Sequence, residues 1–448
     1  MTTKSFSIDN LSLDEMLNWA KNRIVLGPDP INGAKNIETL NKEFENTITE
    51  NGMGWEGAFN IFTKIIIPSI RPFDHPTSLA FVAAAPTPAA SSIDAVLGAA
   101  EIFAGNWDGG SGAIHAENQA LKWIASLAGW STKTAGGVFV SGGTLGNLSA
   151  LHAARTNYRL KNKLNSERLC VLCSVEAHSS IHAIAKVMDI DIIEISSNSF
   201  GQIKIIETKN ALEKNKNIFC IIANAGATNS GAVDDIDGLA HLSNSKKIWL
   251  HVDGAYGLAA LADSNTAKLF SGIHKADSLI VDPHKWLFAP YDSCALVYKD
   301  AKKGAAAHGQ EGNYLEVLDK TAWNPSDFAL HLTRRPRGIP LWFSLTVYGS
   351  KAYANAIKKT MEIAKTIADG IAGIKSLELV LGPQLTVILF RSLKLTEKEI
   401  NLWSEKHRRD GTLLCLPTMW KKNKVLRICV VNPNTEPDKV IKVLKTLN

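Results

Sequence analysis

Six short apolar runs in the middle of the chain restrict its fold more than any other feature. They cover residues 137–143, 169–175, 191–196, 218–226, 248–257 and 277–286, and each is bounded by Gly, Pro or Asp. Segments with helical character, at 144–162 and 179–188, separate several of the runs. Strands that are apolar on both faces and alternate with helices are typical of a parallel sheet covered by helices. We therefore predict an α/β unit with a mainly parallel sheet, in which ligands bind beyond the carboxyl ends of the strands.

The sequence on either side of these runs has a different character, which predicts three parts. Residues 1–70 are expected to form an N-terminal helical arm with a polar surface. Residues 71–340 would form the large α/β domain. Residues 341–448 would form a smaller α+β domain, in which one long helix at 342–371 precedes a strand, a helix, two strands and a terminal helix. The proline-rich segment at 68–92 is apolar, so we expect an ordered loop rather than a linker.

Composition argues against several classes of function. Of the 448 residues, 45% are hydrophobic and 21% are charged, as in ordinary globular enzymes. The net charge of +6 comes from dispersed lysines, so no nucleic-acid partner is expected. No run approaches 18 apolar residues and the start has no apolar leader, so we expect neither a membrane span nor a secretory signal. The six cysteines mostly lie in apolar runs without zinc spacing. Buried reduced thiols, no metal and a cytoplasmic location are therefore expected.

Polar residues follow three of the apolar runs, where a parallel sheet would bring them together. The string SGGTLGNL, with Gly143 and Thr144, places glycines between a strand and a helix. This suits an anion site, or else a tight turn capped by Thr144. Asp253 ends the run IWLHVD and would either hold a buried cationic nitrogen or cap the next helix. His178 follows the run at 169–175 and is either a structural or a catalytic histidine.

Lys285 is the fourth such feature, because it lies between His284 and Trp286 at the end of an apolar run. It is either a strand-end cation or an amine held in a site. Lysine is the residue used where an amine must form a Schiff base, and apolar neighbours such as Trp286, Leu287 and Phe288 would favour its neutral form by desolvation. Together the four features supply a phosphate cradle, a stacking residue, an acid for a pyridinium nitrogen and an amine for an aldehyde. Those are the requirements of pyridoxal 5′-phosphate.

Several longer strings carry a family resemblance. They are DSLIVDPHKWLFAPYDSCALVYKD, HVDGAYG, EAHSS, SGGTLGNL and HLTRRPRGIPLW. They resemble the group II pyridoxal-phosphate-dependent amino-acid decarboxylases, the family of aromatic-amino-acid, histidine and glutamate decarboxylases. The similarity runs from about Phe73 to about Gly349 and continues more faintly beyond. It implies the type I pyridoxal-phosphate-dependent transferase fold, which is aspartate aminotransferase-like, and a homodimer with a shared active site.

The resemblance also implies a role for each matching position. Lys285 would hold the cofactor as an internal aldimine, and Asp253 would pair with the ring nitrogen. His178 would stack on one face of the ring and Ala255 would pack on the other. The remaining contacts are expected from Thr228 near the ring, from Gly143, Thr144 and His284 to the phosphate, and from Asp282, at a position where some members have Asn.

The reaction implied is loss of CO₂ from an L-amino acid to give the amine. Tyr314 matches the loop tyrosine that in this family returns a proton to Cα through the quinonoid stage, and some aldehyde synthases have phenylalanine there. An ordinary surface-loop aromatic is the alternative for Tyr314. Thr333 and Arg334, in HLTRRPRG, match the segment that reaches the neighbouring site in a dimer.

The substrate is expected to be an aromatic or large apolar amino acid. Ala83, Ala84 and Ala85 are small and would leave volume, and no Arg or Lys in this segment indicates a site for a side-chain carboxylate. Two alternatives remain open. One is another reaction of the same cofactor, such as aldehyde synthesis or C–S cleavage. The other is a catalytically silent paralogue that acts as a binding protein, against which the intact Lys285 and Asp253 argue.

Overall fold

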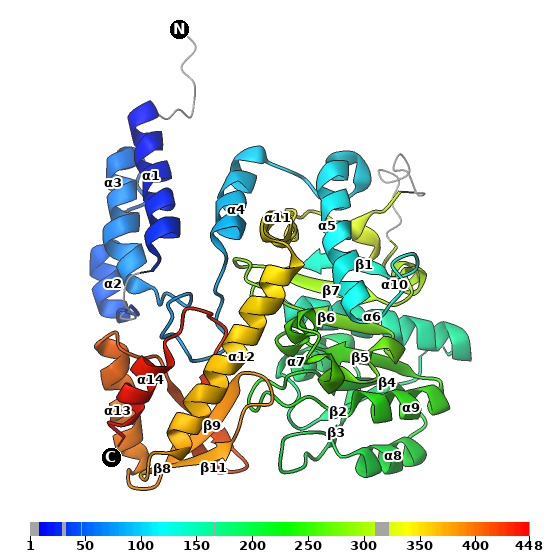
Figure 1. The fold of residues 1–448 in the computed structure, drawn as a ribbon. Coiled ribbons are helices and arrows are strands. Elements are labelled where there is room, and N and C mark those ends of the chain that lie inside the picture. Colours follow the sequence, from blue (N-terminus) through cyan, green and yellow to red (C-terminus); the bar gives the residue numbers. More distant parts are fainter. Residues whose placement is uncertain (1–8, 29–32, 46, 165, 310–321, 448) are drawn as a thin grey trace.

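The computed structural model describes residues 9–28, 33–45, 47–164, 166–309 and 322–447 (Figure 1). Its strands are β1 (Gly136–Val140), β2 (Cys170–Ser174), β3 (Asp191–Ile195), β4 (Ile218–Asn224), β5 (Trp249–Asp253), β6 (Ser278–Val281), β7 (Cys294–Tyr298), β8 (Leu377–Leu381), β9 (Val387–Ser392), β10 (Leu416–Trp420) and β11 (Asn423–Cys429). Its helices are α1 (Asn10–Leu26), α2 (Ile37–Glu43), α3 (Gly54–Ile61), α4 (Pro88–Ala100), α5 (Trp107–Leu127), α6 (Gly143–Asn162), α7 (Ser180–Met188), α8 (Ile205–Lys214), α9 (Ile236–Lys246), α10 (Ala301–His308), α11 (Ile339–Tyr348), α12 (Ser350–Ala372), α13 (Glu397–Arg409) and α14 (Pro437–Leu444). Short helical turns lie at Phe62–Ile66, Ile67–Ser69, Gly257–Ala262, Ala267–Phe270, Ile273–Lys275 and Pro325–Asp327.

The six predicted runs form strands β1 to β6 of one sheet. In the described residues its order is β1-β7-β6-β5-β4-β2-β3, and only β7 runs antiparallel to its neighbours. Every residue of β1, β2, β4, β5 and β6 is buried, which agrees with their nearly continuous apolar character. The predicted α/β fold with a mainly parallel sheet is confirmed.

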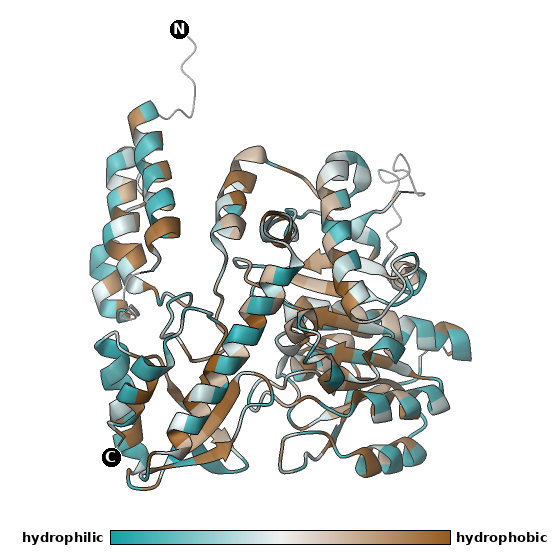
Figure 2. Cartoon of the chain, in the orientation of Figure 1, coloured by the Kyte–Doolittle hydropathy of each residue, from teal (hydrophilic) through white to brown (hydrophobic). Residues whose placement is uncertain are grey.

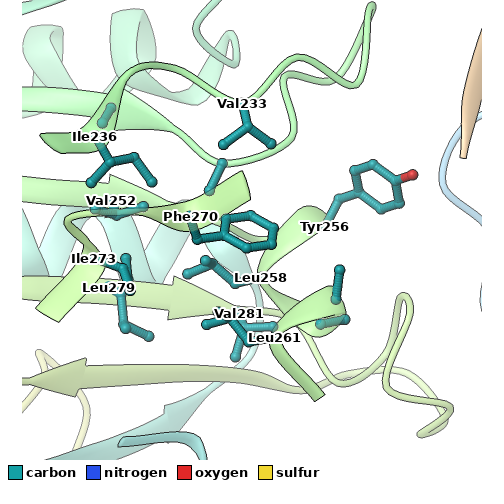
Figure 3. Close-up of a cluster of buried hydrophobic side chains, with 14 of the residues drawn as sticks. Val233, Ile236, Val252, Tyr256, Leu258, Leu261, Phe270, Ile273, Leu279 and Val281 are labelled. Carbon is teal, nitrogen blue, oxygen red and sulfur yellow. The ribbon is translucent and has the colours of Figure 1, made fainter. Parts of the chain in front are cut away.

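Apolar packing on one face of this sheet supports the segment that follows β5. Val252, Leu279 and Val281 of the sheet contact a layer formed by the turns after residue 256 and by the start of α9 (Figure 3). Phe270 lies within this layer and is fully buried. On the other face, α6 lies against β1, β4, β5, β6 and β7. Strands covered on both faces hold the residues at their ends in fixed positions.

The C-terminal part forms a second, antiparallel sheet with the order β10-β11-β9-β8. The segment 377–391 was expected to contain one strand, but Gly382 to Thr386 form a turn between β8 and β9. The single long helix predicted at 342–371 is also wrong. Gly349 adopts φ 78° and ψ 156°, which separates α11 from α12. Apolar periodicity continues through this glycine, and for that reason the break was not predicted.

Within the predicted segment 68–92, residues 70–87 form an ordered loop, as predicted, and connect the two sheets. Residues 88–92 instead form the start of helix α4. Leu79 is fully buried within the apolar cluster of the C-terminal sheet. Its backbone N–H donates to the carbonyl of Leu414, and its carbonyl accepts from the N–H of Cys429. The loop then carries Phe81 and Val82 toward the large sheet.

Helices α1, α2 and α3 stand beside the two sheets rather than within their core (Figure 1). No residue of these three helices is buried. Brown apolar positions are visible along their surface in Figure 2, and Leu11 and Leu26 are 82% and 81% exposed. One described link to the rest of the chain is the ion pair between Arg23 and Asp74, at 2.9 Å.

Candidate active site

A cavity of about 400 Å³ lies at the carboxyl ends of the parallel strands. The predicted residues that line it are Gly143, Thr144, His178, Thr228, Asp253, Ala255, Asp282, His284 and Lys285. They come from the ends of β1, β2, β4, β5 and β6, which the parallel topology brings to one edge. Residues that were not predicted complete the lining: Phe81, Val82, Gly142, Asn147, Asn224, Gly226, Ala227 and Tyr256.

Lys285 lies against the carboxylate of Asp282. Its Nζ is 3.0 Å from Asp282 Oδ2, and the Asp282 side chain is only 1% exposed. Burial lowers the pKa of Lys285, but Asp282 and Asp253 raise it by more, so the net shift is upward. The expectation that desolvation favours the neutral amine is therefore wrong for the protein alone. The carboxylates of Asp282, three residues before Lys285, and of Asp253 outweigh the apolar neighbours.

His284 lies near the same Asp282 carboxylate as Lys285. Its Nδ1 accepts a hydrogen bond from the backbone N–H of Ser293 at 3.0 Å, and its Nε2 lies 3.5 Å from Asp282 Oδ2. Burial lowers the pKa of His284, although Asp282 opposes this shift. The neutral ring thus carries its proton on Nε2, where it faces Asp282 and the cavity.

Asp253 is held in place by an amide and by its own turn. Asn147 Nδ2 donates to Asp253 Oδ2 at 2.9 Å, and the N–H of Ala255 donates to Oδ1 at 3.2 Å. The alternative, an aspartate that caps a helix, is not what the structure has. Asn147 could have been found in the sequence, because it lies one helical turn after Gly143 and so on the same face of α6.

The glycine pair forms the N-terminus of α6. Gly142 is the N-cap and no side chain caps the helix, so Thr144 is not the N-cap that was considered as an alternative. A Cβ on Gly143 would lie 3.3 Å from Asp282 Oδ2 and 3.4 Å from Ala255 Cβ. Glycine therefore lets the start of α6 lie close to Asp282 and Ala255. The first-turn N–H groups have no side-chain cap and suit an anion.

His178 and Thr228 lie at the exposed rim of the cavity. His178 Nδ1 accepts from the N–H of Ser180 at 3.2 Å and lies 2.9 Å from Ser180 Oγ. This contact fixes the orientation of the ring after β2. Thr228 is carried by the loop that follows β4.

Two of the predicted residues are described and are not brought to the cavity. Thr333 is exposed and does not line it. Arg334 is fully buried in its own chain, where both terminal nitrogens lie 2.6 Å from Glu117. The expectation that Arg334 reaches a neighbouring site is therefore wrong, because its guanidinium is already paired. Tyr314 lies outside the described residues.

The substrate side of the cavity differs from the prediction. Ala83 and Ala84 are buried in the protein. None of Ala83, Ala84 and Ala85 lines the cavity, so they do not supply its volume. Phe81 and Val82 lie there instead. Phe81 adopts φ 61°, and its carbonyl accepts a hydrogen bond from Arg427 Nη1 at 2.8 Å. A sequence pattern of side-chain sizes could not anticipate this backbone turn.

Arg427 of β11 is a second residue that the sequence did not reveal. It is 7% exposed, and its Nε and Nη2 atoms have no hydrogen-bond partner within the described residues. Its positive charge lowers the pKa of Tyr256, against a larger upward effect of burial. A buried guanidinium with unused donors beside a cavity is suited to an anionic ligand.

Comparison with known proteins agrees with this geometry. The model of the pyridoxal-dependent decarboxylase conserved domain matches residues 38–393. The chain belongs to this family. It is therefore a pyridoxal-phosphate-dependent amino-acid decarboxylase, a carboxy-lyase, as the sequence motifs predicted.

Relatives of this decarboxylase include enzymes named for aromatic substrates. It is 30% identical over 434 residues to an aromatic-L-amino-acid decarboxylase of Bacillus atrophaeus, covering 93% of this chain and 89% of the relative. It is 30% identical over 400 residues to tyrosine decarboxylase 2 of Arabidopsis thaliana, covering 84% and 73%. A structure of Oryza sativa TDC with pyridoxal phosphate and tryptamine superposes with a TM-score of 0.89 at 20% identity, covering 100% and 98%, which shows the same fold.

The residues of this decarboxylase fit its cofactor. The uncapped helix N-terminus beside Gly143 suits the phosphate, and the Lys285 amine can reach an aldehyde. Asp282 Oδ1 and Asn224 Nδ2 are buried without a hydrogen-bond partner in the described part of the chain. Among the same residues, no group of three or more His, Cys, Asp or Glu could hold a metal, and no helix is long and apolar enough to cross a membrane. All six cysteines are free and buried.

Proposed function

We propose that the enzyme decarboxylates an aromatic or large apolar L-amino acid to the amine and CO₂. The observation that carries this proposal is one cavity lined both by the polar residues Lys285, Asp282 and Asp253 and by the apolar residues Phe81 and Val82. The names of the relatives from Bacillus atrophaeus and Arabidopsis thaliana point to the same substrate class. When bound, pyridoxal phosphate accepts the electron pair left behind as CO₂ departs.

Lys285 is proposed to hold the cofactor covalently. Because Asp282 raises the pKa of its amine, Lys285 is protonated in the free protein and must lose this proton before it attacks an aldehyde. Asp282 Oδ2, at 3.0 Å, is placed to receive the proton. Neutral His284, with its Nε2–H toward the cavity, would then serve the phosphate together with Gly143 and Thr144.

Asp253 is proposed to keep the ring nitrogen of the cofactor protonated. Two donors, from Asn147 and from the N–H of Ala255, hold its carboxylate in place. His178 and Ala255 would cover the two faces of the ring, and Thr228 would lie near its edge. These four positions together would fix the ring plane, and with it the bond that breaks.

Arg427 is proposed to bind the α-carboxylate of the substrate. Its unused Nε and Nη2 donors are buried, and its Nη1 already anchors Phe81, which lines the cavity. Phe81 would then contact the apolar side chain of the same substrate. Arg427→Lys should raise KM more than it lowers kcat, because a point charge replaces a planar fork.

Tyr314 is proposed as the acid that returns a proton to Cα. Release of CO₂ does not need the phenol, whereas protonation of Cα does. In Tyr314→Phe, substrate should still be consumed, amine yield should fall, and aldehyde, ammonia and hydrogen peroxide should appear. If Tyr314→Phe forms amine at the wild-type rate without peroxide, the proton returned to Cα comes from another donor, such as His178.

A homodimer is proposed as the active form, with Thr333 reaching the neighbouring site. Exposed Thr333 and the apolar surface of α1 to α3 support this assembly. Lys285→Ala chains and Tyr314→Ala chains should each form little amine alone, and mixing them should restore part of the amine formation if residues are shared between chains. A fully active monomer in ultracentrifugation would contradict the proposal.

A panel of the twenty amino acids with detection of CO₂, amine and aldehyde tests the whole proposal. Aromatic substrates should give equal amounts of CO₂ and amine. Aldehyde with peroxide from the wild-type enzyme would instead indicate an aldehyde synthase. A panel without any turnover, from protein whose bound cofactor absorbs normally, would favour the silent paralogue.

A further inference from the structure

Behind Asp253, a chain of buried polar side chains runs along the face of the large sheet that α6 covers. Asn147 Nδ2 lies 2.9 Å from Asp253 Oδ2, and Asn147 Oδ1 lies 2.8 Å from His251 Nε2. His251 Nδ1 lies 2.8 Å from Ser278 Oγ, which accepts from Trp249 Nε1 at 2.8 Å. Asn147, His251 and Ser278 are at most 1% exposed, and Trp249 is 7% exposed.

The strand pattern explains how these groups meet. Trp249, His251 and Asp253 are alternate residues of β5, so their side chains point to the same face of the sheet. Ser278 is the residue of β6 paired in register with His251. Asn147 comes from α6, which packs against both strands. Polar side chains on a face that a helix covers need partners, and here each one supplies the next.

The two ends of the chain determine the direction of every hydrogen bond. An indole N–H can only donate, so Ser278 Oγ accepts from Trp249. At the other end the Asp253 carboxylate can only accept, so Asn147 donates to it through Nδ2 and accepts from His251 Nε2 through Oδ1. A neutral His251 that donates through Nε2 then accepts from Ser278 Oγ through Nδ1. Burial lowers the pKa of His251 to about 4, with Asp253 and Ser278 opposing. The ring is therefore neutral, and its one proton is on Nε2. That proton faces Asn147 Oδ1, which turns the amide nitrogen toward Asp253.

We propose that Trp249, Ser278, His251 and Asn147 form a one-way hydrogen-bond relay that holds Asp253 as a carboxylate toward the cofactor ring. His251 and Asn147 are positioning residues, since they act through Asp253. Without the His251 donor, the Asn147 oxygen has no partner and the amide is held only through Nδ2, by Asp253 at 2.9 Å and Ser180 at 3.5 Å, so its oxygen can turn toward Asp253. Two facing oxygens favour a protonated Asp253, which cannot hold a cationic ring nitrogen.

A branch of the relay reaches His178. The second hydrogen of Asn147 Nδ2 points to Ser180 Oγ at 3.5 Å, and that oxygen lies 2.9 Å from His178 Nδ1. Asn147 thus orients Asp253, which is proposed to pair with the nitrogen of the cofactor ring. It also orients His178, which is proposed to stack on that ring. The titratable groups that act on Asp253 or respond to it are Lys285 after β6, His251 on β5 and Cys294 on β7.

The first test uses the unmodified protein. In cofactor-free protein labelled with ¹⁵N-histidine, NMR should show His251 as the neutral Nε2–H tautomer from pH 5 to pH 8. An Nδ1–H tautomer would reverse the direction of the chain and overturn the relay. This measurement needs neither a variant nor a bound cofactor.

The second test uses His251→Phe, which keeps the ring but removes both nitrogens. With ¹⁵N-labelled pyridoxal phosphate bound, the ring nitrogen should lose its proton at lower pH than in the wild type. The dissociation constant for the cofactor should rise about tenfold, as expected for one lost hydrogen bond to a charged group. His251→Gln, which retains an N–H donor, should recover most of both effects.

The control lies on the same helix as Asn147. Ser149 is fully buried and its Oγ has no hydrogen-bond partner within the described residues, so Ser149→Ala should behave as wild type. If the cofactor's ring nitrogen in His251→Phe is protonated as in the wild type, and its dissociation constant is within twofold of the wild-type value, the relay is overturned. If that variant does not fold, Ser278→Ala should shift both measurements in the same direction, and an unchanged result there would also overturn it.

The relay rests on the role proposed for Asp253, so Asp253→Asn is measured in parallel. If Asp253→Asn leaves the ring nitrogen unchanged, the role of Asp253 is wrong and the relay has no function. If Asp253→Asn removes the proton while His251→Phe does not, the proposed function stands and only the relay fails.

Discussion

Strands β2, β4 and β5 bury every residue, whereas helices α1, α2 and α3 bury none. Both regions contain many apolar side chains. In the sheet these are covered by helices of the same chain, with Phe219 and Ile222 fully buried. On α1, Leu11 and Leu17 remain 82% and 58% exposed.

This difference in burial separates the part of the site that one chain forms by itself from the surface that is left for contact with another molecule. The sheet brings Lys285, Asp253 and Asn147 to one edge without help from another chain. The three N-terminal helices leave an apolar surface of a kind that marks an interaction site. Changes in the sheet should therefore affect chemistry and folding, whereas changes in the helices should affect assembly.

The largest effect is expected from Lys285→Ala, which should abolish turnover. The variant should still bind pyridoxal phosphate through the phosphate contacts, because only the covalent link is lost. Borohydride reduction of the wild type followed by peptide mapping should place the label on Lys285. A label on Lys275, which is paired with Asp237 at 2.6 Å, or on Lys299 would contradict the assignment.

Asp253→Asn should lower kcat/KM by about a thousandfold, on the order of 4 kcal/mol of transition-state stabilisation. A neutral amide cannot hold the ring nitrogen protonated. Asp277 provides a matched control, because it lies before β6 at the opposite edge of the same sheet and accepts from the N–H of Leu250. Asp277→Asn should keep activity within about threefold of wild type. Equal losses in the two variants would indicate a general effect of damaging the sheet.

The sequence alone predicted most of this sheet edge. Continuous apolar runs identified the strands, and parallel topology requires the residues after those runs to meet. Gly143, His178, Asp253 and Lys285 were therefore found together. Asn147 was missed, although its position one helical turn after Gly143 places it on the same face of α6; what the sequence does not indicate is its partner Asp253, more than a hundred residues away.

Features that depend on tertiary contacts were predicted poorly. The pKa of Lys285 was expected to fall, but two carboxylates raise it. Arg334 was assigned to a neighbouring site, but Glu117, from a distant helix, pairs with it. Phe81 reaches the cavity through a backbone turn with positive φ that no size pattern indicates.

Phe219→Ala tests how much the buried strands contribute to the free energy of unfolding. Phe219 is fully buried in β4, so its truncation should lower the free energy of unfolding by about 3–5 kcal/mol. Leu11→Ala, at an 82% exposed position of α1, should change it by no more than about 0.5 kcal/mol. Urea unfolding at one protein concentration measures both. A loss of several kcal/mol in Leu11→Ala would show that α1 is part of the folding core.

The smallest effect is expected from Leu17→Asp. This variant tests whether α1 serves assembly rather than folding or chemistry. If α1 packs against a second copy of the chain, a carboxylate at this apolar position would be buried and should weaken the dimer at least about tenfold. Asn18→Asp adds the same charge at the neighbouring exposed position of the same helix and controls for charge and helix propensity. Sedimentation over a range of concentrations should show Leu17→Asp dissociating where wild type and Asn18→Asp do not.

Because the sheet edge is complete in one chain, the Leu17→Asp monomer should still bind pyridoxal phosphate. Its decarboxylase activity should fall as the dimer dissociates, because the site is proposed to be shared. Full activity in that monomer would leave the helices without a part in the reaction, and an undissociated dimer would move the interface away from α1.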